Sequence, residues 1–141
     1  SNHRDPVRNL DALTYLLQIS RRQSYRLIFI LGAASLYERA GWRLYDTLKQ
    51  IPGHEEWIDE PRYGVLELAI LAETTDVKWT GISPQREFYT GPTNTYVLGK
   101  DDIILAEDGK SHVSSGNFAS GLLDEVANAA YMKSRFTIAD K

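Results

Sequence analysis

Residues 25–31 read YRLIFIL, and the secondary structure of this stretch decides between two folds that suit the sequence. Its aromatic and β-branched side chains suit a strand. Apolar residues also recur at steps of three and four through Leu27, Ile30 and Ala34, which is the spacing of one face of a helix. We predict a helix here, because this spacing continues on both sides of the stretch.

The same helical spacing runs from residue 10 to residue 51, and no proline interrupts residues 7–51. Asp5 followed by Pro6 suits the first turn of a helix, and the polar residues 20–24 suit a break between two helices. Residues 6–51 are therefore predicted to form a helical hairpin or one long helix, which ends at Pro52-Gly53.

A strand at residues 25–31 is the alternative. In that case Gly32 is followed by a helix, for which Ser35 and Glu38 form a capping-box pattern, and then by a second strand over residues 65–73. This order is a βαβ unit, and it brings nucleotide-type α/β folds into consideration.

From Gly64 onward the pattern changes to short apolar runs separated by turn residues. We predict strands over residues 65–73, 76–82, 96–98 and 103–106, the last two forming a hairpin. The predicted fold class is α+β, with the N-terminal helical part packed on an antiparallel sheet of about four strands. One domain is expected over residues 1–141, with the helical part at 6–51, the sheet at 64–113 and a closing C-terminal helix at 117–135.

The composition excludes every kind of site that needs cysteine. The chain has 141 residues, a net charge of −3 and no cysteine, so disulfides, thiolate nucleophiles and cysteine-ligated metals are excluded. The charge is uneven: residues 1–50 hold eight basic and four acidic residues, and the remainder is acidic. This split is typical either of a basic face for a partner or of two halves that neutralise each other.

No membrane span is predicted, because the most apolar stretch, residues 27–37, is shorter than the roughly 20 residues that a spanning helix needs. The chain starts at Ser1 and not at methionine, so we expect a processed start, with a removed targeting segment among the alternatives. The compartment stays undetermined, with the cytoplasm slightly favoured.

No motif for catalysis or for a metal or cofactor is complete. Gly109-Lys110-Ser111 has the end of a phosphate-binding loop, but Ile104 stands where the motif needs glycine. His54 lies among acidic residues without the spacing of a zinc site, and His3 is terminal. His112 lies near Ser111, Ser114 and Ser115 without a nucleophile elbow. We predict no cofactor and no metal.

Two groups of residues are candidates for binding. Arg21, Arg22 and Arg26 form the densest basic group and suit phosphate contacts. Trp57, Phe88 and Tyr89 lie in predicted loops where burial is not assured, and exposed aromatic residues are typical of interfaces. These six residues are the predicted binding residues.

The first functional hypothesis is a non-catalytic domain for protein interaction or assembly, including self-association, so an enzyme is not favoured. The alternative is a small enzyme or ligand-binding domain that uses acidic and histidine residues near His54 or His112. The third hypothesis is nucleic-acid binding through Arg21, Arg22 and Arg26, which the negative net charge makes unlikely.

Overall fold

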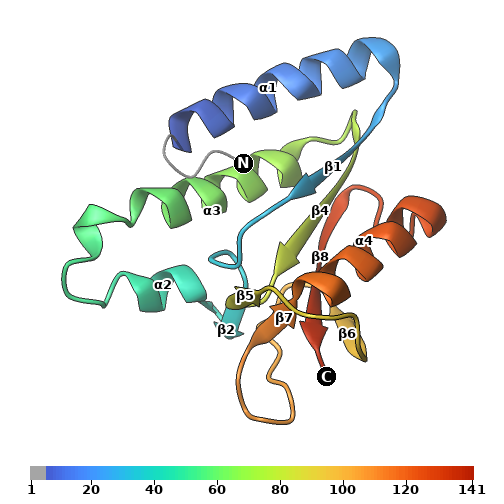
Figure 1. Cartoon of the computed structure of the whole chain (residues 1–141). Coiled ribbons are helices and arrows are strands. Elements are labelled where there is room, and N and C mark those ends of the chain that lie inside the picture. Colours follow the sequence, from blue (N-terminus) through green and yellow to red (C-terminus); the bar gives the residue numbers. More distant parts are fainter. Residues whose placement is uncertain (1–5) are drawn as a thin grey trace.

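The main sheet has four strands and is mostly parallel. The computed structural model describes residues 6–141, so His3 and the expected helix cap Asp5 lie outside the described residues. The strand order is β1 (Arg26–Ile30), β4 (Lys78–Pro84), β8 (Ser134–Asp140) and β6 (Tyr96–Gly99). The first three strands are parallel, and β6 pairs antiparallel with β8 (Figure 1).

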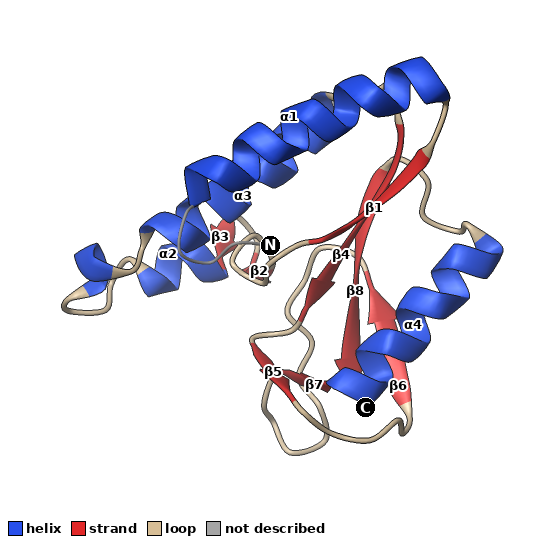
Figure 2. Ribbon diagram, turned by 45° about the horizontal axis from the view of Figure 1, so that its top comes forward, coloured by secondary structure: helices blue, strands red, loops and turns tan. Residues whose placement is uncertain are grey.

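Helices cover both faces of this sheet. On one face lie α1 (Pro6–Gln23) and α3 (Asp59–Glu73), and on the other lies α4 (Ser115–Asn128) (Figure 2). Each face has its own apolar core. The first core joins the helices α1 and α3 to β4, with buried residues that include Leu13, Leu71 and Trp79. The second joins α4 to β4 and β8, through Phe118 and Phe136 among others.

Short elements connect the strands. Between β1 and α3 lie β2 (Tyr37–Arg39), β3 (Trp42–Arg43), α2 (Leu44–Leu48) and the 3₁₀ helix η1 (His54–Glu56). Between β4 and α4, in addition to β6, lie β5 (Glu87–Tyr89) and β7 (His112–Ser114), which pair with each other in parallel. The crossovers from β1 to β4 and from β4 to β8 therefore carry helices on opposite faces of the sheet.

The predicted α+β class and four-stranded sheet are confirmed, but the helical assignment of residues 25–31 and the antiparallel order are wrong. Leu27 and Phe29 pack against the first core, whereas Ile28 packs against the second. A parallel strand that is covered on both faces reads as a continuous apolar run, and such a run imitates helical spacing over short distances.

The predicted helical part at 6–51 is therefore much shorter in the structure. The polar residues 20–24 end α1 and do not link it to a second helix. Ser24 takes a left-handed conformation with φ 57°, and its N–H donates to the Ser20 carbonyl at 2.7 Å. This residue terminates the helix as a C-terminal cap would.

Residues 65–73 belong to α3 and not to the predicted strand. Leu68 and Leu71, one turn apart, both face the core that α3 shares with Leu13 and Leu17 of α1. Leucine, alanine and glutamate favour helices, so here the intrinsic propensity and the packing agree.

The predicted hairpin of residues 96–98 and 103–106 is also absent, because β6 pairs with β8 instead. The closing helix ends at Asn128, earlier than predicted, and Ala129 follows it with φ 49°. Arg135, predicted to lie near the helix end, is a buried residue of the central strand β8. By contrast, the strand predicted at 76–82 agrees closely with β4. Within residues 6–141, no helix has the length and apolar character that crossing a bilayer requires.

Candidate functional site

The larger of two neighbouring cavities lies where β1 and β4 end. Its volume is about 730 Å³, and Leu31 and Gly32, which follow β1, line it together with Pro84, the last residue of β4. Because β1 and β4 are parallel, their carboxyl ends lie at the same edge of the sheet. Ligands in open α/β sheets bind outside this edge.

One face of α3 forms a wall of the larger cavity. Glu60, Tyr63, Gly64 and Glu67 line it and follow one another at helical spacing. A Cβ atom added at Gly64 would have no atom within 4 Å, and the same holds for Gly32 beyond β1. Both glycines therefore leave open space in which a ligand can lie.

Three aromatic side chains line the larger cavity as well. Trp57 lies between η1 and α3, Tyr63 lies on α3, and Phe88 lies on β5. Trp57 is 41% exposed and Phe88 is 48% exposed. The structure thus brings two of the predicted binding residues, Trp57 and Phe88, into one cavity. Aromatic walls of this kind suit the flat face of a ring.

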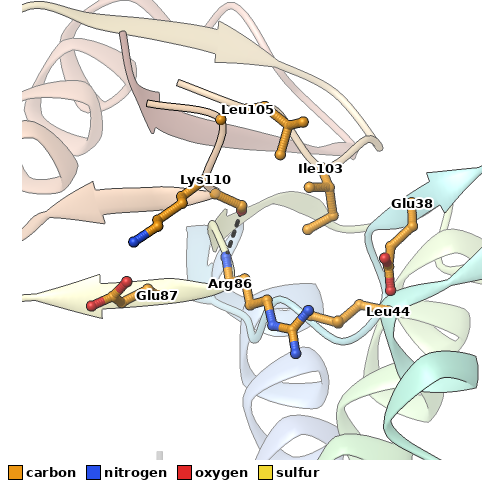
Figure 3. Close-up of a pocket in the computed structure, with 9 residues that line it drawn as sticks. Glu38, Leu44, Arg86, Glu87, Ile103, Leu105 and Lys110 are labelled. Atoms are coloured by element: carbon orange, nitrogen blue, oxygen red, sulfur yellow. Dashed lines mark hydrogen bonds between the residues drawn. The ribbon is translucent and has the colours of Figure 1, made fainter. Parts of the chain in front are cut away.

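A smaller cavity of about 520 Å³ adjoins the larger one. Leu44 and Arg86 line both, and the smaller cavity adds an apolar wall of Ile103 and Leu105 (Figure 3). Its other charged side chains are those of Glu38, Glu87 and Lys110. Arg86 is the one charged residue that the two cavities share.

A buried polar network holds the backbone of Arg86 in place. Its N–H donates to Ser111 Oγ at 3.0 Å, and that hydroxyl donates to Gln85 Oε1 at 2.8 Å. Gln85, which is 1% exposed, also donates from Nε2 to Thr137 Oγ1 of β8 at 2.8 Å and accepts from the Ile104 N–H at 2.8 Å. The end of β4 is thereby fixed to the central strand and to the loop before β7.

Glu67 is the ionisable group in the larger cavity whose properties burial changes. Desolvation raises the pKa of the Glu67 carboxyl above its ordinary value. Its carboxyl therefore keeps a proton to higher pH than an exposed glutamate does, and a protonated carboxyl can donate a hydrogen bond.

The predicted arginine group does not converge on either cavity. Arg21 pairs with Asp76 at 2.7 Å, and Arg22 is exposed. Arg26 lies on β1, where its guanidinium pairs with the buried Glu125 and donates to Thr80 Oγ1. Two of the three guanidinium groups are thus occupied by contacts within the chain.

Tyr89 and His54 also lie outside the cavity linings. Tyr89 donates its hydroxyl to Asp140 at 2.6 Å, and His54 Nδ1 lies 2.8 Å from the Ile51 carbonyl. Of the segment 111–115, Ser111 alone lines a cavity, the smaller one. The sequence did not predict four residues that line the larger cavity: Gly32, Gly64, Glu67 and Arg86. Gly32 carried a signal, because it follows the stretch 25–31 directly.

His112 lies between two carboxylates and does not itself line either cavity. Its Nδ1 is 2.6 Å from Asp140 Oδ2, and its Nε2 is 2.7 Å from Asp108 Oδ2. Both hydrogen bonds raise the pKa of the imidazole, and the one with Asp140 has the larger effect. Burial alone would raise the pKa of Asp140, but hydrogen bonds from Tyr89, His112 and other donors outweigh it and hold that pKa at about 2.

We expect the stabilising effect of His112 to depend on pH. The folded-state pKa of His112 lies above 6.5, so its contribution is complete below that pH and is lost as the pH rises through the folded pKa. Asp140 stays ionised throughout this range. The difference in free energy of unfolding between the wild type and His112→Gln should be larger at about pH 5 than at about pH 8. Urea unfolding at both pH values measures it, and an equal or growing difference would contradict this assignment.

Comparison with known proteins gives no family model that matches the chain. Among curated proteins, it is similar to the uncharacterized protein YwnB of Bacillus subtilis (strain 168). The two are 32% identical over 117 residues, which make up 80% of this chain and 54% of YwnB. The chain thus spans about half the length of this relative.

Solved structures resemble the chain over most of its length. A Lactobacillus casei protein is 33% identical with a TM-score of 0.82, covering 93% of this chain and 61% of that one. A Streptococcus pneumoniae TIGR4 protein, provisionally named an NADH-flavin reductase, is 26% identical with a TM-score of 0.82, covering 100% of this chain and 69% of that one. A Bacteroides thetaiotaomicron protein, provisionally named an epimerase, is 30% identical with a TM-score of 0.74, covering 82% of this chain and 53% of that one.

These neighbours overturn the first functional hypothesis, a non-catalytic domain for protein interaction or assembly. Two of them carry the names of enzymes, an epimerase and a reductase. They agree better with the alternative, an enzyme or ligand-binding domain, although His54 and His112 themselves line neither cavity. The fold of the chain, with helices on both faces of a mostly parallel sheet, is similar to the Rossmann-like folds that bind NAD(P).

Proposed function

We propose that the chain is the flavin-binding part of a Rossmann-like oxidoreductase. The observation that carries this proposal is the place of the larger cavity, outside the carboxyl ends of the parallel strands β1 and β4. The name of the Streptococcus pneumoniae neighbour, an NADH-flavin reductase, points to a flavin as the ligand. In such a reaction, a hydride passes from NADH to the flavin, and a further proton completes the reduced ring.

The residues of the larger cavity fit a flavin ring. A volume of about 730 Å³ lies within the range of small-molecule sites. Trp57, Tyr63 and Phe88 supply aromatic surface on which a flat ring can stack. Gly32 and Gly64 leave room for it. Glu67, when protonated, can donate a hydrogen bond to a carbonyl oxygen or a ring nitrogen of the flavin.

The residues that line the larger cavity include no loop of the kind that binds the diphosphate of NADH. Dinucleotide-binding folds cradle that group with a Gly-x-Gly-x-x-Gly loop between a strand and a helix. Residues 1–141 contain no such sequence, and Gly32 after β1 is followed by two alanines and a serine. We therefore assign the flavin ring, and not the dinucleotide, to the larger cavity.

Riboflavin, which carries the ring without a phosphate, tests the proposal. Its fluorescence anisotropy should rise to saturation as the protein is added. Trp57→Ala should weaken binding by about fivefold or more, because stacking on an aromatic side chain contributes roughly 1–3 kcal/mol.

Tyr25→Ala is the matched control, because Tyr25 is 55% exposed and lines neither cavity. It should leave the affinity for riboflavin unchanged. The absence of saturable binding, or equal losses in the two variants, would contradict a flavin site beside Trp57.

A further inference from the structure

Arg86 stands where the two cavities meet, and we propose that its guanidinium binds the phosphate of a flavin nucleotide whose ring occupies the larger cavity. The inference rests on the proposed function and adds the class of flavin: a phosphorylated one in preference to riboflavin. The shared lining residues, Leu44 and Arg86, make the cavities neighbours, so the tail of a bound flavin can pass from one toward the other.

The guanidinium is available for a ligand. Within residues 6–141, the Arg86 side chain forms neither an ion pair nor a hydrogen bond. The backbone N–H of Arg86 does form a hydrogen bond, which it donates to Ser111 Oγ. Figure 3 shows the side chain extending toward Leu44, away from the amino group of Lys110. Arg86 differs in this respect from Arg26 and Arg135, whose guanidinium groups have carboxylate partners.

The backbone that carries this side chain is held rigidly. The hydrogen bonds from Arg86 to Ser111 and from Ser111 to Gln85 tie the end of β4 to buried side chains. A guanidinium on a fixed backbone binds an oxyanion through two parallel hydrogen bonds with little loss of backbone freedom.

The charged side chains that line the smaller cavity balance one another. In the smaller cavity, Arg86 and Lys110 are balanced by Glu38 and Glu87. No general excess of positive charge therefore draws an anion into this cavity. Preference for a phosphate must come from direct contact with Arg86, which also lines the larger cavity.

The experiment compares flavin mononucleotide with riboflavin, because the two share the ring and differ by one phosphate. Fluorescence anisotropy should show that the wild type binds the mononucleotide about 10- to 100-fold more tightly, the range of a hydrogen-bonded charge contact. Arg86→Met should bring this ratio close to one, because it should weaken binding of the mononucleotide far more than binding of riboflavin. Lys110→Met removes the same charge from the smaller cavity and should keep most of the preference.

The outcomes separate the two proposals. If both flavins bind with equal affinity to the wild type, or if Arg86→Met keeps the preference, the role of Arg86 is wrong while the flavin site stands. If neither flavin binds, the proposed function fails together with this inference. Thermal unfolding of Arg86→Met, whose side chain is exposed, confirms that the variant is folded.

Discussion

Glu125→Ala should lower the free energy of unfolding by about 3–5 kcal/mol, the cost of removing one partner of a buried ion pair. The Glu125 side chain is 3% exposed, and it pairs with Arg26, whose side chain is 19% exposed. The carboxylate also accepts hydrogen bonds from the N–H groups of Ala130 at 3.0 Å and Tyr131 at 3.1 Å. Its removal leaves the Arg26 guanidinium without its carboxylate partner and two partly buried amides without their acceptor.

Urea unfolding measures this loss, and Asp76→Ala is the matched control. Asp76 also pairs with an arginine, Arg21, but the two side chains are 60% and 41% exposed. An exposed pair contributes roughly 0–1 kcal/mol. If Glu125→Ala costs no more stability than Asp76→Ala, the pair that fastens β1 to the end of α4 does not have the importance assigned here.

Gly64→Leu should weaken riboflavin binding by at least about tenfold while the protein stays folded. Gly64 lies on the face of α3 that lines the larger cavity, and a Cβ atom there meets no other atom within 4 Å. A leucine side chain would extend into this space and occupy the place of the ring. Its effect on stability should be neutral or favourable, because glycine costs a helix about 0.5–1 kcal/mol relative to alanine.

Ala69→Leu is the control for the same helix. Ala69 is exposed on α3 and does not line either cavity. Its affinity for riboflavin should match that of the wild type. Binding by Gly64→Leu as tight as that of the wild type would show that the ring does not lie against α3.

The sequence predicted the fold class because local patterns survive in the structure. The strand predicted over residues 76–82 becomes β4, and the first part of the helix predicted over residues 117–135 becomes α4. The error came from residues 25–31, where a strand that packs against a core on each face loses its alternation. Once that strand was interpreted as a helix, the parallel order of the sheet could not be predicted.

The site depends on this same error. Gly32 has meaning only as the residue that follows a parallel strand, so a strand at residues 25–31 would have directed attention to it. Trp57 and Phe88 could be found from the sequence, because aromatic residues in loops are conspicuous. Glu67 and Arg86 could not, since α3 and the end of β4 come together only through the packing of the sheet.

We propose that the cavity outside the carboxyl ends of β1 and β4 binds a flavin ring. An NMR titration of the ¹⁵N-labelled chain with riboflavin tests it most directly. The amide signals of Gly32 and Gly64 should move the most, whereas those of Gly53 and Gly121, which line neither cavity, should stay in place. Saturable binding that leaves Gly32 and Gly64 unmoved, or the absence of any shift, would contradict it.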